Sequence, residues 1–254
     1  MRYLLLADIH ANLHALNAVL EDARNRSWSN ILLLGDYLGY NACPNQVMEC
    51  ILNFNSSGKL SAAIRGNHDN LVLDMCNPDE FNYNARMAGL WTKDVLEEPY
   101  LNWLKQLEEH PVLHEEKIII VHGSLADPKE YLMYEDQALS TVQLMSELDA
   151  KICFNGHTHV PAVFMAKGDN VIRQVITQDH KVKELNPDFY YIVNPGSVGQ
   201  PRDGNKKASY TIFDSSRMVL EFFRISYDIA GAQEEIFSFE ELPTQLALRL
   251  EIGL

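Results

Sequence analysis

The sequence contains too little positive charge for a protein whose partner is a large polyanion. Lys and Arg total 21 residues against 35 Asp and Glu, which gives a formal net charge of -14. Basic side chains must outnumber acids locally to neutralise the phosphates of nucleic acid or of an anionic membrane. Extended binding of either is therefore disfavoured, whereas binding of a small phosphorylated substrate is not.

Cysteine pairs and long apolar runs are also missing. The four cysteines include no CxxC pair, so we expect reduced thiols and not a disulfide framework. The apolar run Leu4–Ala7 is ended by Asp8, far too early for a secretory signal, and no run reaches the ~20 residues that a membrane span needs. We therefore expect a cytoplasmic protein that does not enter a membrane.

The pattern of apolar residues predicts an α/β protein. With 254 residues, 46% of them hydrophobic, the chain can bury a large core, and no repeat or linker divides it, so we expect one domain over residues 1–254. Apolar runs at 2–7, 31–34 and 60–64 alternate with helical periodicity from Leu13 and from Pro44. This order predicts parallel strands joined by right-handed helical crossovers, with the chemistry at the carboxyl ends of the strands.

The second half of the chain has a different order of expected helices and strands. Helices are expected within 78–108 and over 134–148, and strands over 117–121 and 152–154. From residue 161 onward, short apolar runs separated by turns predict a second sheet of mainly antiparallel strands.

Five polar clusters follow apolar runs in this sequence. They are Asp8-Ile9-His10, Gly35-Asp36, Gly66-Asn67-His68-Asp69, His122-Gly123 and Gly156-His157-Thr158-His159. Taken singly, each is compatible with a helix cap, a hydrogen-bonded core histidine or a loop. Five of them at successive strand ends indicate one shared site. Its mixed oxygen and nitrogen donors suit Mn, Fe, Zn, Co or Ni better than an all-oxygen calcium or magnesium site.

In order and spacing, these clusters resemble the motifs of the calcineurin-like metallophosphoesterase superfamily: DxH, GD, GNH[DE], H and GHxH. The resemblance runs from Asp8 to His159 and continues through Asn194-Pro195-Gly196-Ser197. It implies a four-layer αββα sandwich, in which two mixed sheets pack face to face with helices outside. It also implies two divalent transition-metal ions, with manganese expected first and iron, zinc, nickel or cobalt as alternatives.

The resemblance implies a role for each motif residue. Asp36 would bridge the two metals, and His68 would be the catalytic histidine, beside the phosphate and off the metals. The remaining ligands would be Asp8, His10 and His159 for the first metal, and Asn67, His122 and His157 for the second. Two such cations can activate water and polarise phosphoryl oxygens, and a separate imidazole can protonate the leaving oxygen.

The second motif departs from that of the phosphoprotein phosphatase branch, which reads GDxVDRG. This chain has Gly39 and Tyr40 in place of the Asp and the Arg. A Ser/Thr protein phosphatase of that type is therefore disfavoured. The DIHxN start and the loop at 194–204 are instead similar to those of compact bacterial and archaeal phosphodiesterase-like members.

Two residues outside the metal motifs are candidates for substrate binding. Arg202 would clamp a nonbridging phosphate oxygen and so replace the missing arginine, because a guanidinium matches phosphate in a bidentate fork. The alternative is that Arg202 is a solvated loop charge in a turn. Asn12, in the DIHxN start, is a weaker candidate for the same task.

The residues and the resemblance together predict a metal-dependent phosphoric ester hydrolase, a phosphodiesterase or phosphatase for small, nucleotide-like substrates. One alternative is a nuclease, which the acidic balance disfavours. The other is a non-catalytic metal-binding scaffold of the same fold, which we would expect to have lost His68 or several ligands. The expected partner is a small phosphorylated substrate, and both a monomer and a homo-oligomer stay open.

Overall fold

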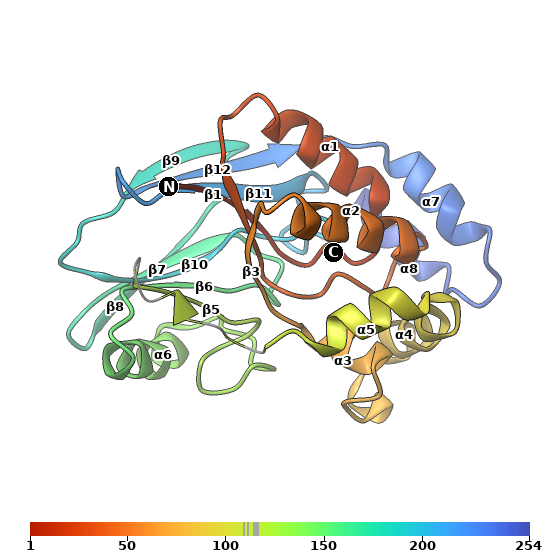
Figure 1. Ribbon diagram of the computed structural model, residues 1–254, viewed down its shortest axis with the longest axis horizontal. Helices are drawn as coiled ribbons and strands as arrows, with labels where there is room; N and C mark the ends of the chain where they lie inside the picture. Colours follow the sequence, from red (N-terminus) through yellow and green to blue (C-terminus); the bar gives the residue numbers. More distant parts are fainter. Residues whose placement is uncertain (109, 111, 114–116) are drawn as a thin grey trace.

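Two six-stranded sheets form the centre of the molecule, for which a computed structural model describes residues 1–108, 110, 112–113 and 117–254 (Figure 1). The first sheet has the order β3 (Leu60–Ala63), β2 (Asn30–Leu33), β1 (Arg2–Leu6), β11 (Ala208–Asp214), β12 (Val219–Ile225) and β9 (His180–Glu184). The second has the order β4 (Val112–Leu113), β5 (Ile118–Ile120), β6 (Ile152–Phe154), β10 (Tyr190–Asn194), β7 (Ala162–Lys167) and β8 (Asn170–Val175).

The first half of the chain forms the parallel unit that its periodicity predicts. Strand β1 pairs in parallel with β2, and β2 with β3. The crossovers are α1 (Leu13–Ala23) and α2 (Pro44–Ser56). Helix α1 begins where the Asn12 side chain accepts the backbone N–H of Ala15, and α2 begins at Pro44, whose missing N–H is no loss in a first turn.

The prediction that the tail forms a second sheet holds for β7, β8 and β10 but is wrong for β11 and β12. Strands β11, β12 and β9 extend the first sheet beyond β1, whereas β7, β8 and β10 join β5 and β6 in the second. Both sheets are consequently mixed. The tail strands do pair mainly antiparallel, but a run of alternating residues does not encode which neighbour it will meet.

Side chains alternate along the strands and so fill three apolar layers. In β1, Tyr3 and Leu5 face the second sheet, while Leu4 and Leu6 face α1 and α2. In the second sheet, Ile119 points outward to α6 (Glu135–Glu147). Burying one large apolar side chain stabilises the fold by about 1.5–3 kcal/mol, so these layers fix the register of each sheet.

The helices complete a four-layer αββα sandwich, which confirms the expected fold class. Helices α1 and α2 cover the outer face of the first sheet, and α6 covers the second (Figure 1). The other helical elements are α3 (Asn67–Val72), η1 (Pro78–Glu80), α4 (Tyr83–Val95), α5 (Glu98–Lys105), α7 (Ile229–Phe237), α8 (Gln245–Leu248) and η3 (Arg249–Glu251). Across the described residues, no helix combines the length and apolarity needed to cross a membrane.

Candidate metal centre

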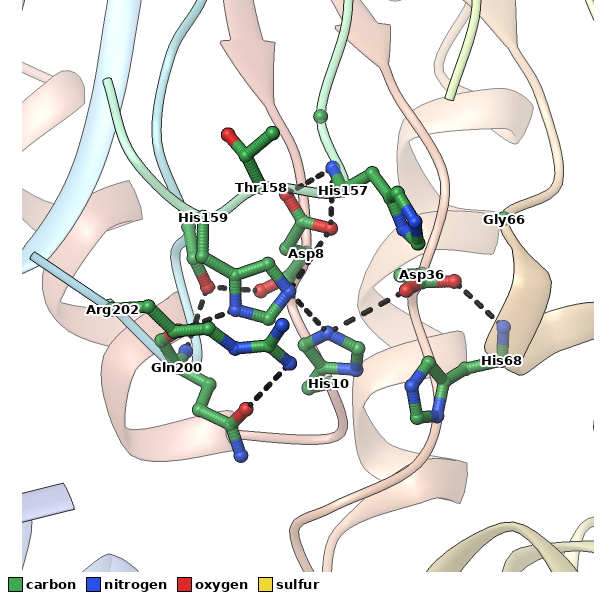
Figure 2. A network of polar contacts seen from close by, with 12 residues as sticks. Asp8, His10, Asp36, Gly66, His68, His157, Thr158, His159, Gln200 and Arg202 are labelled. Carbon is green, nitrogen blue, oxygen red and sulfur yellow. Dashed lines mark hydrogen bonds and ion pairs between the residues drawn. The ribbon is translucent and has the colours of Figure 1, made fainter. Parts of the chain in front are cut away.

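The seven predicted metal ligands follow the carboxyl ends of strands from both sheets. Asp8 and His10 follow β1, Asp36 follows β2, and Asn67 begins α3 just after β3. His122 follows β5 in the second sheet. His157 and His159 follow β6. Figure 2 shows several of these side chains converging from both sheets.

The ligand atoms form two groups that share Asp36. One oxygen or nitrogen atom from each of Asp8, His10, Asp36 and His159 lies within 4.8 Å of the others, and the same holds for Asp36, His122 and His157. Asn67 joins the second group, since its Oδ1 lies 3.2 Å from His122 Nε2. The structure therefore brings together all seven residues, with Asp36 in the position of a shared ligand.

Backbone carbonyls orient the histidine rings. The Nδ1 atoms of His10, His122 and His159 donate to the carbonyl oxygens of Leu38, Leu34 and Gln200, at 2.8, 2.9 and 2.5 Å. Each of these bonds leaves Nε2 facing the centre. His157 is reversed, because its Nε2 contacts the carbonyl of Lys129 at 3.0 Å and leaves Nδ1 available. Such outer hydrogen bonds fix ring orientation and raise the basicity of a metal-ligating histidine.

The carboxylate of Asp36 supplies the clearest sign that a cation fits here. Its Oδ1 accepts the backbone N–H of His68 at 2.9 Å, but its buried Oδ2 has no hydrogen-bond partner. That Oδ2 lies 3.6 Å from His10 Nε2 and 3.2 Å from His122 Nε2. A buried carboxylate oxygen that faces only imidazole nitrogens needs a compensating positive charge, which is the proton on His122 in the metal-free protein and would be a metal ion in the loaded protein.

Burial also sets the protonation of the ligand residues. It lowers the pKa of His157 to about 3 and that of His10 well below its ordinary value, so both rings are neutral, as metal binding requires. Burial opposes protonation of His122 as well, but the charge of Asp36 outweighs it and raises the pKa of His122 to about 9. A metal ion bound to this ring would have to displace that proton.

The backbone is held in an unfavourable conformation at most of the ligands. Asp8, His10, Asp36, His157 and His159 have φ values of 53°, 49°, 53°, 67° and 60°. Residues with a Cβ rarely occupy this left-handed region, and the cost is of order 1–3 kcal/mol each where the surroundings impose it. Such strain gathers at functional sites, and the sequence gives no direct signal of it.

Asp69 is a positioning residue to which the sequence reasoning gave no role. Its Oδ2 accepts the backbone N–H groups of Asp36 and Gly66, both at 2.9 Å, and its Oδ1 accepts those of Tyr37 and Leu38 at 3.0 and 3.2 Å. One carboxylate thus ties the Asp36 loop to the start of α3. The signal that could have found it is an acid three residues after Gly66 at a helix start.

Replacing Asp69 by Ala should destabilise the metal-free protein by about 3 kcal/mol or more, because four buried N–H groups would lose their acceptors. Denaturant unfolding in a chelating buffer measures this directly. Asp69→Asn, which keeps one carbonyl oxygen, should lose less. Equal stability of Asp69→Ala and the wild type would show that Asp69 does not hold the loop.

His68 lies beside the ligands but is not a member of either ligand group. Its ring packs 4.9 Å from the ring of His10 and 4.4 Å from that of Tyr40, and its buried Nδ1 has no hydrogen-bond partner. Burial lowers the pKa of His68 to about 4. A Cβ at Gly39, where φ is +80°, would lie 2.7 Å from His68 Nδ1, so an aspartate there would need a different loop conformation.

The two candidates for substrate binding differ in their surroundings. Arg202 extends over His10 and His159 (Figure 2), and its guanidinium donates to Tyr40 Oη at 3.1 Å and Tyr131 Oη at 3.3 Å. The side chain of Asn12 is occupied at both ends: it caps α1, and its Nδ2 donates to the carbonyl of Gly199 at 2.9 Å. The geometry thus favours a structural role for Asn12 and leaves Arg202 as the stronger candidate.

Comparison with known proteins places this geometry in a family. The profile of the calcineurin-like phosphoesterase superfamily domain matches residues 1–218. The uncharacterized protein MJ0912 of Methanocaldococcus jannaschii is 39% identical over 257 residues, which cover 98% of this chain and 96% of that protein. The crystal structure of a metallophosphoesterase from Sphaerobacter thermophilus is 34% identical, with a TM-score of 0.83 over 100% of this chain and 99% of that one.

A third comparison concerns the fold alone. The hypothetical protein PH1004 from Pyrococcus horikoshii is 20% identical, and its structure aligns with a TM-score of 0.78 over 100% of this chain and 98% of that chain. Its structure agrees with the sandwich described above. The chain belongs to the calcineurin-like phosphoesterase superfamily.

Proposed function

We propose that the protein is a binuclear metal-dependent phosphoesterase that hydrolyses phosphodiester or phosphomonoester bonds of small, nucleotide-like substrates. The observation that carries this proposal is the pair of ligand groups that share Asp36, whose buried Oδ2 lies near the Nε2 atoms of both His10 and His122. Asp8, His10, Asp36 and His159 would hold one ion, and Asp36, Asn67, His122 and His157 the other. Two divalent ions bound there would supply Lewis-acid polarisation of the phosphoryl group and a nucleophilic water at neutral pH.

The cavity beside these residues suits a small substrate. It has a volume of about 170 Å³ and is lined by His68, His157, Tyr40, Phe81 and Tyr131 among others. That is below the ~300–1,000 Å³ of pockets for drug-sized ligands, so the cavity would enclose the phosphoryl group while the rest of a nucleotide-like substrate extends out of it. A larger cavity of about 730 Å³ lies between Gly204 and Ile252 and includes none of the motif residues, so volume alone does not locate the chemistry.

His68 is the proposed proton donor to the leaving oxygen. Its ring lines this cavity, and it is not among the residues of the two ligand groups. An alkyl or sugar oxygen leaves poorly as an alkoxide, so a proton delivered as the ester bond breaks lowers the barrier. Burial keeps the ring neutral in the absence of substrate, with a pKa of about 4, so the negative charge of a bound phosphate ester would have to raise the pKa of His68 before the ring could donate this proton.

A substrate panel tests the proposed function. Aryl monoesters, aryl diesters, cyclic nucleotides and dinucleoside polyphosphates should be offered to the protein with manganese added. We expect hydrolysis of at least one class, and loss of that activity in a chelating buffer. Metal-loaded protein that hydrolyses none of them would favour the non-catalytic scaffold.

Replacing Arg202 by Ala should weaken turnover of a phosphate ester without removing metal, because Arg202 would contact the substrate and not the cations. Loss of a charge-assisted hydrogen bond to phosphate predicts an increase in KM on the order of 10- to 100-fold. Steady-state kinetics together with metal analysis measure both effects. Unchanged kinetics would show that Arg202 is a loop charge that does not bind the substrate.

A further inference from the structure

Two arginine side chains share the ring of Tyr40 at the edge of the metal centre. The guanidinium carbon of Arg202 lies 5.6 Å from the ring centroid, and that of Arg249 lies 5.7 Å from the same centroid. The ring of Tyr40 in turn packs 4.4 Å from the ring of His68. Arg249 is therefore only one aromatic ring away from the proposed proton donor.

Arg249 comes from a part of the chain that the family profile does not include. The profile match ends at residue 218, whereas Arg249 begins η3, directly after α8. This segment is well anchored. Ala247 and Leu250 are buried in a cluster with Tyr40 and Trp91, and Gln233 Nε2 donates to the carbonyl of Ala247 at 3.0 Å. The position of Arg249 is thus set by a packed core.

No Asp or Glu side chain forms a salt bridge with either guanidinium within the described ranges of the chain, although the charge of the buried Asp8 carboxylate also acts on Arg202. Arg202 donates to the neutral oxygens of Tyr40, Tyr131 and Gln200. Arg249 Nε donates to the main-chain oxygen of Leu254. Burial lowers the pKa of Arg249, and the nearby charge of Arg202 lowers it further. Two like charges at a common ring are unfavourable unless an anion joins them.

We propose that Arg202 and Arg249 form a two-part anion site, and that the substrate carries a second phosphoryl group near the ester phosphate that is hydrolysed. Arg202 would bind a nonbridging oxygen of the reacting phosphate, and Arg249 would bind the second phosphoryl group. The ring of Tyr40 contacts both guanidinium groups. This inference rests on the proposed function, because it names the substrate class of the same site.

Binding of three adenosine nucleotides tests the inference without relying on turnover. AMP, ADP and adenosine 3′,5′-bisphosphate share the base and the ribose and differ in the second phosphoryl group. Calorimetry should use metal-loaded protein carrying His68→Asn, which suppresses hydrolysis of the ligands. We expect ADP or the bisphosphate to bind more tightly than AMP by on the order of 10- to 100-fold, the scale of charge-assisted hydrogen bonds to phosphate.

Adding Arg249→Gln to the His68→Asn protein should remove most of this difference in affinity. Arg249→Lys should restore part of the difference because it keeps the charge. Arg217→Gln is the matched control, since Arg217 is exposed in the turn between β11 and β12, near Arg2 at the opposite end of β1. Thermal unfolding of each variant verifies that it is folded.

Three results would overturn the inference. The first is that neither ADP nor the bisphosphate binds more tightly than AMP in the parent protein, and the second is that the tighter binding persists in Arg249→Gln. The third is an equal loss of the tighter binding in Arg217→Gln. Failure of the proposed function can be distinguished from these results. It would appear as absence of hydrolysis by the wild type, regardless of how the affinities for AMP, ADP and the bisphosphate compare.

Discussion

Asp36→Asn is expected to leave the protein without a complete set of metals, with at most one ion bound per chain instead of two. An amide offers one weak oxygen donor where the carboxylate offers two, and its NH₂ would face the Nε2 atoms of His10 and His122. Turnover should fall by at least the ~10²- to 10³-fold that accompanies loss of one charge-stabilising group in other active sites. Elemental analysis and kinetics on the same preparation test both effects.

The matched control is Asp94→Asn, which makes the same charge change at an exposed position on α4. It should retain both ions and full turnover. Two ions in Asp36→Asn would show that Asp36 does not bridge them. A single ion in fully loaded wild type would end the binuclear proposal altogether.

His68→Ala should retain its metals and lose activity to an extent that depends on the leaving group. An alkyl or nucleoside oxygen needs a proton to depart, whereas a nitrophenolate leaves readily without one. General acid catalysis is typically worth about 10²- to 10⁴-fold, so that loss is expected for alkyl esters, with a clearly smaller loss for nitrophenyl esters. Rates for a matched aryl and alkyl pair, with metal content measured in parallel, provide the test.

His180→Ala serves as the control for removing an imidazole, because His180 lies on the edge strand β9 and stacks on Phe223, remote from the motif residues. It should leave both rates unchanged. Equal losses on the aryl and alkyl esters in His68→Ala would mean that His68 acts on the phosphoryl oxygens and not on the leaving group.

The sequence was most informative where apolar runs end in polar clusters. Residues 2–7 and 31–34 predict buried strands because their side chains are apolar on both faces, and both strands lie in the middle of a covered sheet. The motif order then identified the family, and the structure gathers Asp8, Asp36 and His157 as that order requires. Their roles as ligands are still predictions.

The sequence did not reveal features that depend on neighbouring segments or on contacts between residues far apart in the chain. Strand β9 was missed because His180–Glu184 is an edge strand with polar side chains on both faces, so it carries no apolar alternation. Helix α3 has six residues, fewer than two turns, which is too short for an apolar stripe to recur. The contact of Arg249 with Tyr40 joins residues more than two hundred positions apart, and no local pattern encodes it.

The position of β1 between β2 and β11 has a consequence for synthesis of the protein. Leu4 lies opposite Ile31 on one side and Ile212 on the other, so one edge of β1 stays unpaired until residues 208–214 have left the ribosome. At about 5–20 residues per second, that interval lasts on the order of 10–40 s. An apolar strand edge exposed for so long invites pairing between nascent chains. The yield of folded protein in the cell should therefore depend on whether this edge of β1 is protected from other nascent chains before β11 emerges.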